Sequence, residues 1–121
     1  TKRNSHHWEY WTDFLNGDIV VKTMPYKCAL EYVADMISAS KVYNGKNFKK
    51  EIPLAYFLKR VDHYYLSTAT REFVIWALTC YSINEWKDLK KDKTKSKYLD
   101  ITSKYPDVEL IKETRHDKKE N

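Results

Sequence analysis

Phe73-Val74-Ile75-Trp76-Ala77-Leu78 is the stretch that decides the fold of this 121-residue chain. These residues would be apolar on nearly every side of a helix, whereas a surface helix is apolar along one stripe only. Upstream, Ser67-Thr68 supplies residues that cap the first turn of a helix. The sequence therefore predicts a long helix over residues 69–91 that runs through the middle of the core, with Trp76 at its centre.

Turn-forming residues are scarce, with two glycines and three prolines in the whole chain. All-β folds need such residues at every hairpin, so the shortage favours long helices with few connections. A chain of this length builds one hydrophobic core. We expect an all-α fold, a single domain of about four main helices.

Three further helices are predicted from the spacing of apolar residues. Met24-Pro25 and Pro53 provide proline near the first turn of two of them. Asn16-Gly17-Asp18 and Asn44-Gly45-Lys46 end two of them. Between the first two, Ile19-Val20-Val21 is too short to classify and fits a loop packed under its neighbours. The expected helices cover residues 2–15, 26–43 and 54–65.

The pattern weakens beyond Lys93. Tyr98-Leu99 and Ile101 are expected to add one last turn against the body. We therefore expect the helical domain to cover residues 1–104, and residues 105–121 to form a polar, flexible tail.

The chain carries a net charge of +5, and residues 87–97 contain six lysines against two aspartates. Basic clusters of this kind can contact phosphates. A solvated helix end is the alternative, since lysine in a last helical turn complements the helix dipole. Nucleic-acid binding is the weaker hypothesis, because no recognised nucleic-acid-binding motif is present.

Cys28 and Cys80 are far apart in the sequence and form no Cys-x-x-Cys motif. They are expected to be small core residues of a protein in a reducing compartment. No apolar run approaches the length of about 18 residues that marks a membrane-spanning helix, and no signal peptide is recognised. We expect a cytoplasmic protein with no membrane partner.

His6-His7-Trp8-Glu9-Tyr10-Trp11 combines two imidazoles, a carboxylate and three large aromatic side chains. Histidine is the commonest metal ligand in proteins, and an apolar shell around such a group controls the access of water. Helical spacing places His7 on the apolar stripe and His6 on a more polar one, so His7 is expected to point inward.

Asp35 lies within the apolar run Ala34-Asp35-Met36-Ile37. A carboxylate buried in such surroundings is costly unless it is paired or bound to a metal. Helical bundles build metal sites from side chains on facing helices. We therefore take His6, His7 and Asp35 as candidate ligands of a divalent metal ion.

Glu9 is the candidate catalytic acid or base beside this metal. Each of these residues also has a simpler interpretation. Adjacent histidines near a terminus are often surface residues, and Glu9 is equally typical of a helix surface. Asp35 would then face water or pair with Lys41, Lys59 or Arg60.

These motifs resemble an uncharacterised family of phage and bacterial proteins whose hallmark is NpHHWEYW … MP … EMvcDW.a. The resemblance is carried by residues 4–11, Met24-Pro25 and residues 29–39, and extends more loosely to Arg71. That family is similar to the HD-domain metal-dependent phosphohydrolases, which implies an HD-like helical fold and assigns His6, His7 and Asp35 to a metal site. An HD-type site also uses a histidine and a His-Asp pair upstream of this motif, before Thr1. The resemblance therefore implies half of a site, completed by an amino-terminal segment or a companion chain.

Two hypotheses of function follow, and the sequence does not decide whether the chain is an enzyme. In the first, the metal activates water for attack on a phosphate ester of a nucleotide or related small molecule. The second is a non-catalytic, phage-encoded helical module that binds a protein or nucleic acid. In either case the resemblance implies the cytoplasm of a bacterium or a phage-infected host cell. In the first hypothesis, the cations expected to neutralise the phosphate are Arg3, Lys59 and Arg60, with Lys2 as a further candidate.

Overall fold

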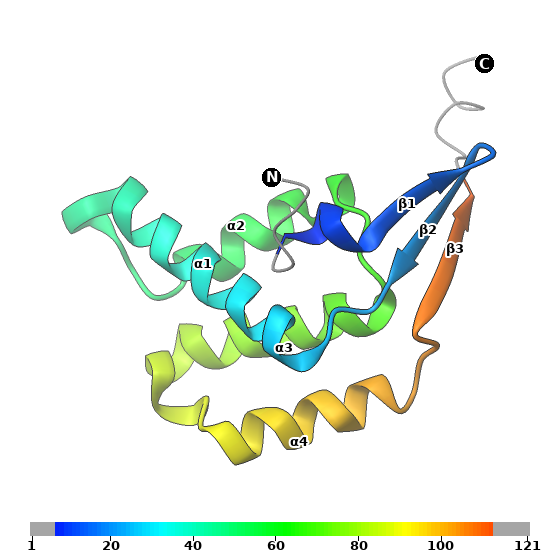
Figure 1. Ribbon diagram of the computed structural model, residues 1–121. Coiled ribbons are helices and arrows are strands. Elements are labelled where there is room, and N and C mark those ends of the chain that lie inside the picture. Colours follow the sequence, from blue (N-terminus) through cyan, green and yellow to red (C-terminus); the bar gives the residue numbers. More distant parts are fainter. Residues whose placement is uncertain (1–6, 113–121) are drawn as a thin grey trace.

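The structure is a computed structural model that describes residues 7–112, and within them it contains four α-helices and a three-stranded antiparallel sheet (Figure 1). The all-α expectation holds for the helical body and is wrong for the sheet. The helices are α1 (Tyr26–Asn44), α2 (Ile52–Arg60), α3 (Thr68–Asn84) and α4 (Lys91–Thr102). The strands are β1 (Thr12–Leu15), β2 (Asp18–Lys22) and β3 (Val108–Lys112). Short 3-10 turns are η1 (Trp8–Trp11), η2 (Gly45–Asn47), η3 (Val61–His63) and η4 (Glu85–Asp88).

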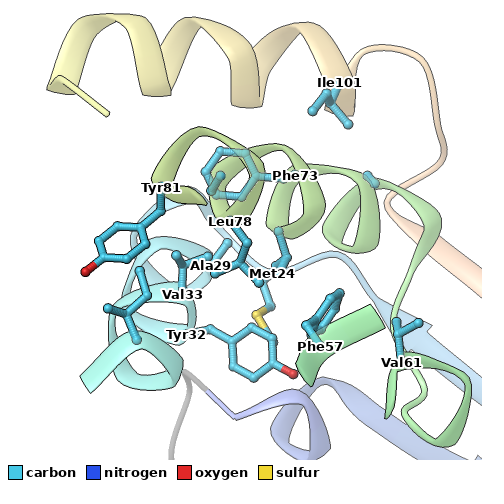
Figure 2. Packing of buried hydrophobic residues seen from close by; sticks show 14 residues of the cluster. Met24, Ala29, Tyr32, Val33, Phe57, Val61, Phe73, Leu78, Tyr81 and Ile101 are labelled. Atoms are coloured by element: carbon cyan, nitrogen blue, oxygen red, sulfur yellow. The ribbon is translucent and has the colours of Figure 1, made fainter. Parts of the chain in front are cut away.

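Helix α3 is the central element, as the sequence predicts. It contacts α1, α2 and α4, with α4 on the side away from α1 and α2 (Figure 1). The Ser67 hydroxyl accepts a hydrogen bond of 3.1 Å from the Thr70 N–H and caps the helix. Figure 2 shows side chains of several elements converging on this core. The buried residues of α3 are Ala69, Thr70, Phe73, Val74, Ala77, Leu78 and Tyr81.

Trp76 does not lie at the centre of the core, so that prediction is wrong. Its side chain is only partly buried at the margin of the cluster, whereas Phe73 and Leu78 are fully buried. The apolar run covers every side of α3, but the neighbouring helices α1, α2 and α4 do not enclose it completely. Trp76 lines an open groove beside α4 instead.

The helix predicted over residues 69–91 is present as α3, but it ends seven residues earlier than predicted. Helix α3 ends at Asn84, Glu85 takes a φ of 57°, and after η4 the chain returns as α4 beside α3 (Figure 1). This reversal lets α4 bury Thr94 and Ile101, and tertiary packing of this kind outweighs the preference of a sequence for continuing a helix. The last turn expected around Ile101 is accordingly part of a helix of 12 residues.

The helix predicted over residues 2–15 is also wrong within the described residues, where η1 is followed by a β-hairpin. Asn16 and Gly17 join β1 to β2 with φ values of 52° and 84°. Positive φ at both central residues is the mark of a type I′ turn, for which Asn-Gly is the favoured sequence. Ile19 and Val21 are buried and alternate with the more exposed Val20, so the unclassified Ile19-Val20-Val21 is the core of the middle strand.

Strand β3 lies in the segment that was expected to be a tail. It pairs antiparallel with β2, placing Ile111 opposite Ile19 and Glu109 opposite Val21. The Thr23 N–H donates a hydrogen bond of 2.7 Å to the Asp107 carbonyl just before the strand. A boundary at residue 104 therefore separates β3 from its own sheet. Residues 113–121 lie outside the described part of the chain.

The two predicted helices over residues 26–43 and 54–65 are present as α1 and α2. Helix α1 extends one residue further than predicted, whereas α2 begins at Ile52 and ends at Arg60 because η3 follows it. Cys28 and Cys80 are free thiols with intermediate burial rather than core residues. None of the helices in residues 7–112 is long and apolar enough to cross a membrane.

Candidate functional site

Aromatic packing places the HHWEYW segment against the chain that follows η3. The Trp8 ring stacks on Tyr64 with a centroid distance of 5.9 Å and an interplanar angle of 29°, and it meets the edge of Tyr65 at 5.8 Å. The Thr12 hydroxyl lies 3.1 Å from both the Trp8 and the Tyr65 carbonyl oxygens, to which it donates. Aromatic pairs contribute about 0.5–1.5 kcal/mol beyond their buried area. These contacts hold η1 in place without the helix that the sequence predicts.

The charge of Glu9 acts on a buried phenol of helix α1. Burial raises the pKa of the Tyr32 phenol on α1 well above its ordinary value of 10.0, and the charges of Tyr64 and Glu9 raise it further. Tyr32 itself is buried, while Glu9 is exposed. Trp8 of η1 stacks on Tyr64 and packs against the buried cluster that includes Tyr32, so η1, α1 and the residue after η3 border the same part of the core.

His7 and Asp35 lie on the two elements that meet there. His7 is half-buried in extended backbone directly before η1, and its carbonyl accepts a hydrogen bond of 3.1 Å from the Tyr10 N–H. Asp35 lies one helical turn after Tyr32, and residues three apart lie on the same side of a helix. Asp35 is exposed, so the inference that it is buried among apolar residues is wrong. His6 and Arg3 lie outside the described residues.

The donor types of this site suit a divalent cation, since imidazole nitrogen and carboxylate oxygen are common ligands of such ions. The number of donors is smaller than such an ion requires. Within residues 7–112, no three histidine, cysteine, aspartate or glutamate side chains gather closely enough to hold a metal ion. His7 and Asp35 alone supply too few donors, and their assignment as metal ligands stays a prediction.

An open groove of about 470 Å³ runs beside η1 and β1. Among the predicted site residues in the described chain, Glu9 alone lines this groove. Asp13 brings a second carboxylate to it from β1, which the sequence analysis missed because it treated residues 2–15 as one helix. The residues lining the groove are Trp8, Glu9, Tyr10, Thr12, Asp13 and Phe14.

Lys59 and Arg60, the predicted phosphate ligands, are exposed on the last turn of α2. The Arg60 guanidinium lies 5.2 Å from the centre of the Tyr56 ring, a cation–π contact. Neither residue lines the groove beside η1. Their role in phosphate binding stays a prediction.

Comparison with known proteins identifies one family. The sequence model of a family described as a family of unknown function (DUF5662) matches residues 1–79. The matched region includes η1, the hairpin, α1, α2 and most of α3, and it ends before α4 and β3. No curated protein and no solved structure matches the chain.

Proposed function

The chain belongs to the DUF5662 family, and from that premise we propose that it is part of an HD-like, metal-dependent phosphohydrolase acting on a nucleotide or a related phosphate ester. One observation carries the proposal. Trp8, the residue after His7, packs against the buried cluster that includes Tyr32 of α1, so the segment with His7 and the helix with Asp35 border the same part of the core. The HD-like character itself comes from the sequence resemblance.

In this proposal His7 and Asp35 are two ligands of a divalent ion, and His6 is the third. A bound divalent ion would act as a Lewis acid and lower the pKa of a bound water. Catalytic sites of this type use three or more protein ligands, so any remaining ligands come from a companion chain or another segment.

In this proposal Glu9 is the general acid or base. Its carboxylate is exposed in an open groove with aromatic walls, where it can take a proton from water or return one to a leaving group. Lys59, Arg60 and Arg3 would neutralise the phosphate, Lys59 and Arg60 from the exposed end of α2.

Calorimetric titration of the chain with Mn²⁺ and Zn²⁺ tests the ligand assignment. His7→Ala and Asp35→Asn are each expected to weaken binding by more than about tenfold, while the melting temperature of the metal-free protein changes little. His63→Ala is the matched control, because His63 is an exposed histidine on η3. Equal affinities in all four proteins would reject the metal site. If His7→Ala destabilises the metal-free protein strongly, His7 is a packing residue.

Release of inorganic phosphate from nucleotides tests the reaction. With Mn²⁺ present, the chain alone is expected to be inactive, because its ligand set is incomplete. Rapid hydrolysis by the purified chain would contradict the need for a companion. In a complete assembly, Glu9→Gln is expected to lower the rate by about 10²- to 10⁴-fold without altering metal affinity.

A further inference from the structure

A second groove, of about 480 Å³, lies between α3 and α4, away from η1. It is open along its length, and its floor includes the partly exposed Trp76 of α3. Figure 1 shows α4 running beside α3 on the side opposite α1 and α2. The residues that line the groove are Trp76, Lys93, Ser96, Lys97 and Asp100.

Two lysines of α4 contribute positive charge to the groove between α3 and α4. Lys93 and Lys97 lie on successive turns, about 6 Å apart along the helix axis. Both charges act on the Cys80 thiol of α3, where they oppose the rise in pKa that burial and Asp88 cause. Both lysine side chains line the groove that contains Trp76.

Neither Lys93 nor Lys97 is held by an ion pair in the described part of the chain. Asp100, the acidic residue lining the groove, is 3.5 Å from the Lys104 ammonium. The charge of Asp92, the other acidic residue near the start of α4, raises the pKa of Tyr26 on α1.

We propose that this groove binds single-stranded nucleic acid, with a base stacked on Trp76 and backbone phosphates on Lys93 and Lys97. Sites for single strands combine a positively charged groove with aromatic side chains on which bases stack. Small-molecule sites enclose most of their ligand, whereas this groove is open and suits a strand that continues beyond it. The proposal is independent of the metal site, because this groove shares no residue with the groove beside η1 and contains none of the candidate metal ligands.

Fluorescence anisotropy with a labelled single-stranded oligonucleotide of about 12 nucleotides tests this site. The variant Lys93→Gln/Lys97→Gln is compared with Lys91→Gln/Lys95→Gln, which removes the same charge from exposed positions of α4 outside the groove. The first pair is expected to weaken binding by more than about tenfold. It should also reduce the slope of log K against log salt by about 1.4, from two lost phosphate contacts. The control pair is expected to change affinity less than about twofold.

Equal weakening by the two pairs would overturn the site, because binding would then follow overall charge alone. Duplex bound as tightly as single strand would overturn the stacking on Trp76. Binding to phosphatidylserine vesicles but not to the oligonucleotide would assign the lysines to a lipid surface and overturn the proposal.

Trp76→Leu supplies an independent readout. If its circular dichroism matches that of the unchanged protein, affinity for the single strand is expected to fall at least about fivefold, as for loss of one stacked base. Unchanged affinity in the folded variant would overturn the proposal. If Trp76→Leu fails to fold, the two lysine pairs decide the result, since all four positions are on the surface of α4.

Discussion

The Glu109 carboxylate of β3 accepts two hydrogen bonds, each 3.1 Å long, from the backbone N–H and the hydroxyl of Thr68 in the first turn of α3. The first N–H groups of a helix have no partner within the helix, and that end carries a partial positive charge. Glu109 satisfies one of these groups and places a negative charge beside them. The Tyr105 hydroxyl, just before β3, donates a further hydrogen bond to the Glu72 carboxylate of α3. The third strand is thereby tied to the central helix.

Glu109→Ala is expected to lower the free energy of unfolding by about 1–2 kcal/mol, because it removes a capping acceptor and a favourable charge. Urea denaturation measures the loss. Glu51→Ala is the matched control: Glu51 is exposed before α2 and makes no side-chain cap. That control should stay within about 0.5 kcal/mol of the parent protein. Equal effects of the two substitutions would show that the bonds to Thr68 contribute nothing.

Phe73→Ala is expected to destabilise the domain more than Trp76→Ala, although tryptophan is the larger residue. Phe73 is fully buried, and truncating such a side chain costs about 3–5 kcal/mol. Trp76 is partly exposed to the groove beside α4, so less buried area is lost. Chemical denaturation of both variants checks the order. A larger loss of unfolding free energy for Trp76→Ala would show that Trp76 lies at the centre of the core.

The stability of the domain is expected to fall as the pH rises above about 10, and Tyr32 should dominate the decline. Its folded-state pKa is raised above the ordinary value of 10.0, chiefly by burial. The stabilisation is therefore complete below the unfolded-state pKa of about 10 and is lost as the pH rises through the folded-state pKa. Tyr32→Phe should make the decline shallower in denaturation curves recorded across this range. Tyr43→Phe is the control, because that side chain is 91% exposed and its removal should leave the decline unchanged.

Glu9→Gln tests whether Glu9 faces Tyr32. The Glu9 charge contributes to the raised pKa of this phenol, so its removal should lower that pKa. The phenolate absorbance followed through an alkaline titration reports the change. Asp13→Asn, also on the groove beside η1, is the matched control. An unaltered titration in Glu9→Gln would show that the Glu9 charge does not act on Tyr32.

Gly45 and Glu85 occupy equivalent positions after α1 and α3, with nearly the same backbone conformation. Gly45 has φ 53° and ψ −130°, and Glu85 has φ 57° and ψ −131°. A side chain is strained in this region, whereas glycine is not. Glu85→Gly is therefore expected to raise the free energy of unfolding by about 1 kcal/mol, and Gly45→Ala to lower it by at least as much. Thermal unfolding measures both, and a lower melting temperature for Glu85→Gly would contradict the strain.

The same pair explains why one helix end is predictable and the other is not. Glycine at position 45 is the usual signal that ends a helix, and α1 ends beside it as predicted. Position 85 holds glutamate, a good helix former. The local sequence therefore does not predict that α3 ends at Asn84. The hairpin is a different case. Asn16-Gly17 is a strong signal for a hairpin turn, but the helical spacing of the aromatic residues before it favours the incorrect prediction of a helix over residues 2–15.

Local periodicity and turn chemistry in the sequence by themselves determined α1, the start of α2 and the central place of α3. The sequence also identifies the imidazole and carboxylate groups of the HHWEYW segment as candidate site residues. Tertiary structure alone decided the reversal at Glu85, the pairing of β3 with β2, the approach of Glu9 to Tyr32 and the groove beside Trp76. The physical reason is the range of the forces involved. A helix can be predicted from apolar residues three and four positions apart. A strand partner, a strained reversal and a shared groove depend instead on residues that are distant in sequence. Their contacts exist only once the core has formed.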